Sequence, residues 1–265
     1  QAILLGILQG ITEFLPISSS GHLVIVPHLF GWPDPGIAMD AMLHVGTLVA
    51  IMVFVAEDLW TLAKAAVEGL LRRSLVNPDA RVAWAVVIAT VPGALLGFFL
   101  EDLFEALFGM PRAAAGFLLV TAVLLLIAEY VGRRERPITT ISWLGAIAVG
   151  IGQALAIAPG ISRSGATIAA GMILGFRRED AARFSFLLAV PIMLGSGAYA
   201  LYKWVSGSAV SSSPAPIVAL GMLAAAVSGY FAVAGLMALV RRRRLVGFAV
   251  YCALLGTLVF TGLLG

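Results

Sequence analysis

The chain has 265 residues, of which 61% are hydrophobic and 12% are charged, and its formal net charge is +3. A soluble domain is about half apolar and about a quarter charged, so this composition excludes an ordinary soluble globule. It also excludes a disordered chain and, because there is a single cysteine, a disulfide scaffold. The basic runs are short and hold no interleaved aromatic residues, so we expect no nucleic-acid partner. We therefore predict an all-α polytopic membrane protein with one integral membrane domain, residues 1–265.

Six apolar stretches are suited to cross a membrane as helices, which need about 20 residues each. They cover residues 41–56 (extendable to about 60), 82–100, 113–132, 184–204, 216–240 and 246–264. Basic residues gather in four clusters between these stretches, at 72–81, 133–136, 177–183 and 241–244. Because loops rich in arginine stay in the cytoplasm, we place all four clusters on that side. The acidic group Glu101, Asp102 and Glu105, the loop 206–216 and both termini then face outward.

Two further segments are broken in the middle and are expected to begin and end on the same side of the membrane. Residues 1–31 are interrupted by Pro16 and a serine run, and residues 138–176 by Pro159 and Gly160. A chain that enters a membrane and returns on the same side is a re-entrant hairpin. We predict two such helical hairpins, the first entering from outside and the second from the cytoplasm.

The two hairpins also share residues. A shift of 144 positions superposes Gln9 on Gln153, Ser18 on Ser162, Ser20 on Ser164, Gly21 on Gly165 and Gly31 on Gly175. Each half, roughly 1–136 and 137–265, then holds one hairpin and about three spans. An odd number of spans per half predicts an inverted-topology repeat whose broken helices meet near the membrane midplane. The alternative is a chance similarity between two stretches rich in serine and glycine.

The first polar motif is QGITEFLPISSSGH, residues 9–22. A charge at membrane depth costs about 2.5–3.5 kcal/mol, so Glu13 is a candidate functional residue. Gln9 lies four positions before Glu13 and shares its helix face. Pro16 ends that helix, and the following serines are suited to cap the next one. Glu13 with His22 suggests acid–base chemistry or water activation, and a neighbouring serine suggests a nucleophile.

The second polar motif is QALAIAPGISRSGAT, residues 153–167. Its Arg163 lies at a predicted helix start, flanked by Ser162, Ser164 and Thr167. A helix N-terminus offers free N–H groups and a partial positive charge, so two such termini with an arginine suggest a phosphate or diphosphate site. Two simpler interpretations stay open: the serines can be plain helix caps, and Arg163 can be a structural partner of Glu13.

Other polar residues are expected to have structural roles. We expect His28 and His44 to be packing or interfacial residues, Asp40 to be a solvated interfacial residue, and Glu129 to form a local ion pair. Arg241 to Arg244 is expected to be a topology anchor that also favours anionic lipid. Small residues within the spans are expected to allow close helix packing: Gly93, Gly97, Gly195, Gly197, Gly221 and Gly229.

The two motifs, their order and their hydrophobic setting resemble those of the bacterial undecaprenyl-diphosphate phosphatases, also called bacitracin-resistance proteins. The family's Ser-Ser-x-Gly-His element falls on Ser18, Ser19, Gly21 and His22. Its phosphate-gripping Ser-Arg-Ser-Gly-x-Thr element falls on Ser162, Arg163, Ser164, Gly165 and Thr167. Where family members carry either an acidic residue or glutamine, this chain has Gln9, which leaves Glu13 as the carboxylate of the pair.

The resemblance implies hydrolysis of undecaprenyl diphosphate to undecaprenyl phosphate and inorganic phosphate, which recycles the lipid carrier for cell-wall synthesis. It implies a divalent cation, Mg²⁺ or Ca²⁺, and a site that opens to the periplasmic face of the bacterial inner membrane. The implied partners are the polyprenyl diphosphate substrate and membrane lipids, with a homodimer left open.

The residue chemistry and the resemblance predict the same roles. Arg163 and its neighbouring hydroxyls hold the diphosphate, with Gln9, Ser18, Gly21 and Gln153 completing the binding residues, and Glu13 orients the cation or activates the nucleophile. Ser19 attacks the terminal phosphorus with His22 as its base or as the acid to a leaving oxygen, or water prepared by Glu13 and His22 attacks directly. The alternative function is a lipid-phosphate or anion transporter, which would use the same midplane site without hydrolysis.

Overall fold

The computed structural model describes residues 1–33, 36–100, 107, 110–206 and 214–264. The acidic group Glu101, Asp102 and Glu105 and most of the loop 206–216, both expected to face outward, lie outside these described residues. Apart from one isolated bridge between Arg136 and Phe176, the secondary structure of the described residues is helical.

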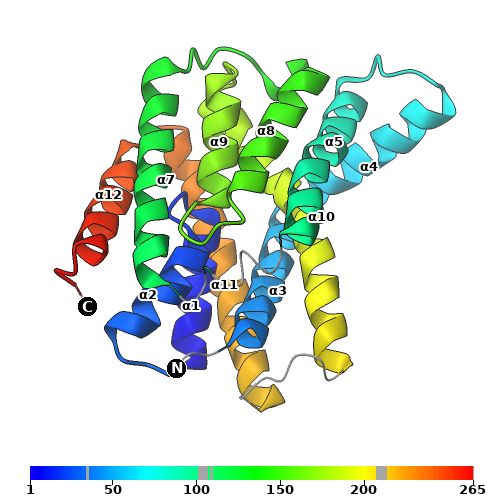
Figure 1. Cartoon of the computed structure of the whole chain (residues 1–265). Helices are drawn as coiled ribbons and strands as arrows, with labels where there is room; N and C mark the ends of the chain where they lie inside the picture. The colour runs from blue at the N-terminus through cyan, green and yellow to red at the C-terminus, as the bar shows by residue number, and fades with distance from the viewer. Residues whose placement is uncertain (34–35, 101–106, 108–109, 207–213, 265) are drawn as a thin grey trace.

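The helices before residue 137 are α1 (Ala2–Phe14), α2 (Ser19–Leu29), α3 (Ile37–Phe54), α4 (Ala56–Leu71), α5 (Pro78–Phe99) and α7 (Pro111–Val131). Those after it are the short 3₁₀ helix η1 (Ile138–Thr140), α8 (Trp143–Leu155), α9 (Arg163–Ile173), α10 (Arg178–Val205), α11 (Ala215–Val240) and α12 (Val246–Phe260). Figure 1 shows them as one bundle of helices.

Four of the described helices are long and apolar enough to cross a membrane, namely α5, α7, α10 and α11. The pair α3 and α4 would give a fifth span, although the two helices are bent by 74°. The chain is therefore an all-α polytopic membrane protein. The expected span 246–264 is the shorter helix α12, which has 15 residues.

The helix α4 was not predicted from the sequence. The expected first span ends with α3 at Phe54, and the chain then turns into a helix that carries Glu57, Asp58, Lys64 and Glu68. These charges make Ala56–Leu71 poorly suited to continue through a membrane. Arg183 of α10 donates from Nε to Asp58 Oδ2 over 2.8 Å, which ties the first turn of α4 to the bundle.

The two broken helices meet in the middle of the molecule, as the sequence predicts. In Figure 1, α1 and α2 approach the centre from one end, and α8 and α9 approach it from the other. The connections between the paired helices touch, because the backbone N–H of Gly160 donates to Ser18 Oγ at 3.2 Å and Ser164 Oγ donates to the Leu15 carbonyl at 3.0 Å. The inverted repeat itself stays a prediction.

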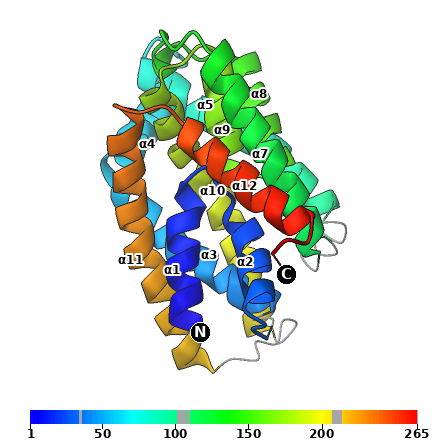
Figure 2. The same ribbon diagram turned by 90° about the vertical axis from the view of Figure 1, so that its left-hand side faces the viewer.

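Two of the four basic clusters, and Leu245 directly after a third, are joined at one end of the bundle by Glu129, which is only 2% exposed. Its carboxylate accepts hydrogen bonds from Arg134 (2.8 Å), from Arg178 (2.6 and 2.8 Å) and from the backbone N–H of Leu245 (2.8 Å). The expected local ion pair is present with Arg134, but Glu129 also binds Arg178 and Leu245, which are 49 and 116 positions away and were not predicted. Figures 1 and 2 show α1 beginning and α12 ending toward the opposite end.

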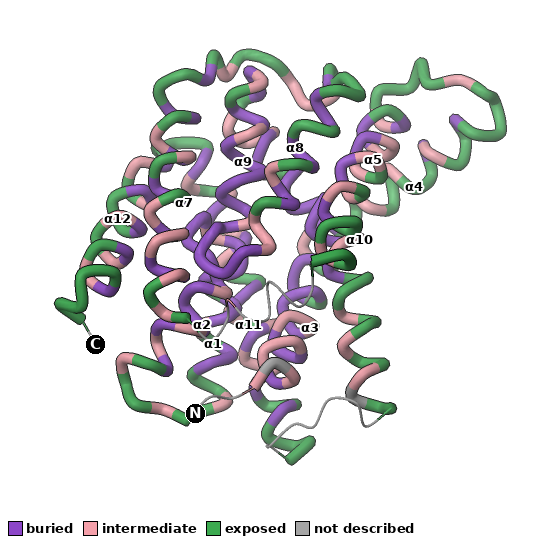
Figure 3. The backbone as a smooth tube through the Cα atoms, viewed as in Figure 1, coloured by how far each residue is buried: buried purple, intermediate pink, exposed green. Residues whose placement is uncertain are grey.

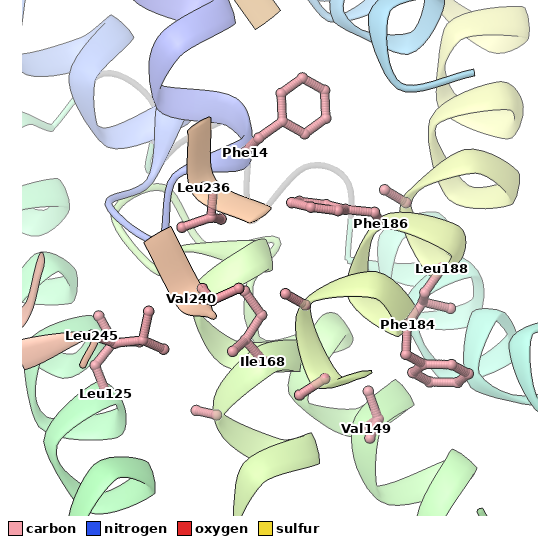
Figure 4. Packing of buried hydrophobic residues seen from close by; sticks show 14 of the residues in the cluster. Phe14, Leu125, Val149, Ile168, Phe184, Phe186, Leu188, Leu236, Val240 and Leu245 are labelled. Atoms are coloured by element: carbon pink, nitrogen blue, oxygen red, sulfur yellow. The ribbon is translucent and has the colours of Figure 1, made fainter. Parts of the chain in front are cut away.

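Figure 3 shows buried residues gathered at the centre of the bundle and exposed residues on its outside. Many of the exposed residues are large and apolar. Close to the site, Phe14 of α1 packs edge-on against Phe186 of α10, with ring centroids 5.9 Å apart (Figure 4). Leu236 and Val240 of α11 belong to the same cluster, so the end of α1 is held between α10 and α11. This packing fixes the position of Glu13, the residue that precedes Phe14.

Candidate active site

Glu13 is the centre of a cluster of polar side chains at the end of α1. Arg163, the first residue of α9, donates from Nη2 to Glu13 Oε1 at 2.7 Å. The hydroxyl of Ser19 donates to Oε2, and so does Gln9 Nε2, at 3.0 Å. A buried charge is tolerated only when it is paired and hydrogen-bonded, and Glu13, at 7% exposed, satisfies both conditions.

Local sequence signals place Ser19 beside this carboxylate. Leu15 adopts an extended conformation (φ −66°, ψ 143°) before Pro16, which ends α1. Ser18 then caps α2, its hydroxyl accepting the Gly21 N–H at 3.3 Å. The backbone of Ser18 has φ = +69°, which is unusual for a residue other than glycine, and its hydroxyl also accepts the N–H of Gly160 from the second hairpin. The strained conformation is therefore held by both hairpins.

A matching arrangement places Arg163. Ser162 caps α9, and its hydroxyl accepts the Gly165 N–H at 3.0 Å. Gly160 has φ = +106°, and a Cβ there would lie 2.1 Å from the Ala114 carbonyl, so only glycine fits. Thr121 of α7 donates to the Gly160 carbonyl and accepts from the Ser162 N–H, both at 2.9 Å. The connection between α8 and α9 is thus fixed against α7.

The cluster lies in a cavity of about 650 Å³. The polar or charged side chains that line it belong to Glu13, Ser18, Ser19, Ser20, Asp40, His44, Thr90, Gln153, Ser162, Arg163, Ser196 and Tyr199. Two helix N-termini, those of α2 and α9, are therefore at the cavity through their capping serines, and Arg163 adds a full positive charge. This combination is suited to bind an anion such as a phosphate group.

The remaining predicted residues are buried beside the cavity rather than in its lining. Thr167 bonds to the hydroxyl of Ser185 at 2.6 Å, and Ser164 donates to the Leu15 carbonyl. The predicted residues Gly21 and Gly165 supply the amides that the capping serines accept. These contacts support the cavity wall and do not reach into it.

His22 does not join the cluster. It is 3% exposed and absent from the cavity lining, and both of its ring nitrogens have partners: Nδ1 lies 2.7 Å from the Ser18 carbonyl and Nε2 lies 2.7 Å from the hydroxyl of Tyr251. The His22 and Tyr251 rings are stacked, with centroids 5.7 Å apart. His22 thus connects the start of α2 to α12.

The histidine that lies beside Glu13 is His44, and the sequence did not predict this contact. Its Nε2 lies 3.5 Å from Glu13 Oε2, and its side chain lines the cavity, so it is not the packing or interfacial residue that we expected. Asp40, expected at the interface, lines the cavity too. These residues are four positions apart in α3 and share a helix face, which is the signal that could have identified them.

The side chains present offer a divalent cation few ligands of their own. Among the described residues there is no group of three or more His, Cys, Asp or Glu side chains that could hold a metal. Glu13 supplies one carboxylate, which Arg163, Ser19 and Gln9 already contact. Mg²⁺ is often bound by one or two carboxylates together with substrate phosphates, and this donor set fits a cation shared with a diphosphate.

The fold and the site together define a class of protein: an integral membrane protein with a cluster of buried charged and hydroxyl side chains where two broken helices meet. Comparison with known proteins narrows the class. The family described as bacitracin resistance protein BacA matches residues 2–258, and this chain belongs to that family.

Similar proteins from three bacteria are all named undecaprenyl-diphosphatase. The protein of Rubrobacter xylanophilus is 44% identical, and the match covers 98% of this chain and 96% of the relative. That of Geobacter sulfurreducens is 42% identical, with coverage of 97% and 95%. That of Pelobacter propionicus is 38% identical, with coverage of 100% and 98%.

Proposed function

We propose that this protein is a membrane phosphatase that hydrolyses undecaprenyl diphosphate to undecaprenyl phosphate and inorganic phosphate. Such a reaction recycles the lipid carrier for cell-wall synthesis. The observation that carries the proposal is the contact of Arg163 and Ser19 with one carboxylate, Glu13, at the polar end of a membrane cavity. The names of the similar proteins support it.

Arg163 and the two helix starts would bind the diphosphate. The guanidinium uses Nη2 for its ion pair with Glu13, and its Nη1 makes only a long contact, 3.5 Å, to the Ala189 carbonyl. Donors therefore remain for phosphate oxygens, and an arginine bound to phosphate stabilises the charge that spreads over the transferring phosphoryl group.

Ser19 is placed to be the nucleophile. Its hydroxyl donates to Glu13 Oε2, so the carboxylate can take the proton as the oxygen attacks the terminal phosphorus. The new Ser19 O–P bond forms while the bond to the bridging oxygen breaks, and undecaprenyl phosphate leaves. Water then attacks the phosphoserine, phosphate departs, and Ser19 regains its proton. Direct attack by a water that Glu13 deprotonates is the rival path.

His44 would act as the acid to the leaving phosphate, which is one of the two roles expected of His22 from the sequence. Its Nδ1 donates to the Asp40 carbonyl at 2.8 Å, so Nε2 is the ring atom that faces Glu13 and the cavity. From there it could protonate the leaving phosphate and accept a proton from the attacking water. His22 has a hydrogen-bond partner at each nitrogen and would instead hold α2 in place.

A divalent cation, Mg²⁺ or Ca²⁺, would be held by Glu13 together with oxygens of the bound diphosphate. When bound it would neutralise phosphate charge.

The protein would lie in the bacterial inner membrane with the cavity open toward the periplasm. The cavity is lined by the first half of α3, the second half of α5 and the second half of α10. These halves lie away from the arginine-rich connections and toward the end that carries the termini (Figure 1). The positive-inside rule then gives a periplasmic opening and outward termini. A homodimer stays a prediction.

Phosphate release from undecaprenyl diphosphate by the purified protein in detergent tests the proposal. A phosphatase needs no membrane gradient, so we expect release that depends on Arg163. A lipid-phosphate or anion transporter, the alternative that the sequence left open, would bind the diphosphate and release no phosphate.

A further inference from the structure

The cavity has two chemically different ends. One end carries the charged and hydroxyl groups contributed by α1, α2, α3 and α9. The other is formed by facing stretches of α5 and α10 whose lining residues are mostly apolar or small: Gly93, Ala94, Gly97, Phe98, Pro191, Ile192, Gly195 and Gly197, with the polar residues Thr90, Ser196 and Tyr199 among them. A ligand that fills the cavity must therefore be an anion at one end and hydrocarbon at the other.

The apolar walls include both buried and exposed residues, and the exposed ones include Ala94 and Gly195. On α5, Gly93 is buried, Gly97 is half-buried and Phe98 is 77% exposed. On α10, Met193 is buried and Tyr199 is 47% exposed. The exposed lining residues Phe98, Gly195 and Tyr199 thus place part of the cavity, between α5 and α10, at the apolar outer face of the bundle.

Two glycines keep this opening wide. A Cβ added to Gly195 would meet nothing within 4 Å, and one added to Gly97 would meet only Ile157 Cδ1, at 3.6 Å. Close helix packing, the role that we expected for all six glycines, is found at Gly93, Gly197, Gly221 and Gly229, where an added Cβ would lie 2.9–3.2 Å from a neighbouring side chain. Gly97 and Gly195 therefore border open space.

The size of the cavity limits what it can hold. A volume of about 650 Å³ is typical of a pocket for a drug-sized ligand. A diphosphate with its first isoprene units would fill the cavity, so the rest of a long polyprenyl chain must extend outside it.

We propose that the prenyl chain of the bound substrate extends out of the cavity between α5 and α10. Gly97 and Gly195 then determine how long a chain the enzyme accepts. The inference rests on the proposed function, since it assigns the route of that substrate's hydrocarbon tail. Side chains larger than glycine at either position would close the route behind the first isoprene units, while a short tail would still fit.

Gly97→Leu and Gly195→Leu test the proposal with farnesyl diphosphate and undecaprenyl diphosphate as the two substrates. We expect kcat/KM for the long substrate to fall by about ten- to a hundredfold, and for the short one by much less. Leucine has a higher helix propensity than glycine, so the substitutions are compatible with folding. The matched control is Gly235→Leu, an exposed helical glycine outside the cavity with nothing within 4 Å of its Cβ.

Unchanged kinetics with both substrates, equal losses with both, or the same change in Gly235→Leu would each overturn the assignment. Failure of the parent protein to release phosphate from either substrate would instead overturn the proposed function, and the two failures are therefore distinguishable.

A second readout does not depend on turnover. Gly195→Cys should react with a maleimide, while the native Cys252 is fully buried. We expect saturating undecaprenyl phosphate to slow this reaction and inorganic phosphate to leave it unchanged, with Gly235→Cys insensitive to both. A reaction rate that undecaprenyl phosphate does not alter would contradict the route.

Discussion

Glu13 and Arg163 are 150 positions apart in the chain, yet their side chains meet at 2.7 Å where the two broken helices touch. Each residue is the charged member of its own motif, and neither motif alone forms the site. The pair connects the end of α1 to the start of α9, so the two hairpins share one ion pair in addition to their hydrogen bonds between serine hydroxyls and backbone. The proposed active site therefore forms only where the two hairpins meet.

Arg163→Ala should lower phosphate release by at least about a hundredfold, because the phosphoryl charge loses its main donor. It should also destabilise the protein by about 3–5 kcal/mol, since Glu13 is left buried without its partner. The exposed Arg243→Ala is the control, and we expect parent-like activity from it. Equal losses in the two variants would contradict the phosphate-binding role.

The double variant Glu13→Gln with Arg163→Met separates the loss of activity in Arg163→Ala from its loss of stability. Removing both charges should restore much of the lost thermal stability in detergent, because no unpaired charge stays buried. Activity should stay absent. Recovery of activity together with stability would show that the pair is only structural.

Ser19→Ala should abolish turnover if the hydroxyl is the nucleophile, and rapid quenching of the parent enzyme should trap a phosphoserine at Ser19. The neighbouring Ser20→Ala removes a hydroxyl that also lines the cavity but is not in contact with Glu13, and it should change the rate by only a few fold. Substantial turnover by Ser19→Ala would favour direct attack by water.

The chain has three histidines, so their substitutions form a complete set. His44→Gln should lower kcat by about 10²–10⁴-fold with little loss of stability, because a proton-transfer group is removed from the cavity. His22→Gln should chiefly lower the melting temperature, and Tyr251→Phe should do the same, because both disrupt the contact between α2 and α12. The exposed His28→Gln should resemble the parent. If His44→Gln retained the parent's kcat, the assignment of His44 would fail.

Glu129→Ala should destabilise the protein without acting on the chemistry. It leaves Arg178 and Arg134 without their shared carboxylate and the Leu245 N–H without an acceptor, and breaking a buried ion pair costs about 3–5 kcal/mol. Glu179→Ala removes an exposed ion pair with Arg241 and should cost at most about 1 kcal/mol. The melting temperatures of the two variants in detergent are compared. A similarly small decrease in both would show that Glu129 does not stabilise the bundle.

Much of the hairpin geometry could be predicted from short-range signals. The matched residues Ser18 and Ser162 both cap helices, each accepting the N–H three positions later. Gly31 and Gly175, matched by the same shift, both have positive φ angles of 61° and 92°. Proline breaks, serine caps and glycine turns act within a few residues, so their positions are readable without the fold.

The bend between α3 and α4 could not be predicted in this way. The junction between α3 and α4 is Val55, which is neither a glycine nor a proline, and the two helices are bent by 74° there. The charges of α4 and the contact of Asp58 with Arg183, 125 positions away, decide where the helix turns.

The sequence by itself determined the class of the protein, the two polar motifs and the helix breaks, because hydropathy and capping are local properties of the chain. Only the tertiary structure decided which polar side chains share the cavity. In the folded chain His44 lies beside Glu13, His22 contacts Tyr251, and open space borders Gly97 and Gly195. The physical reason is that each of these depends on how separate helices pack against one another. A motif can specify a residue's helix and face, but the neighbouring helix decides whether that face meets a partner, a ligand or open space.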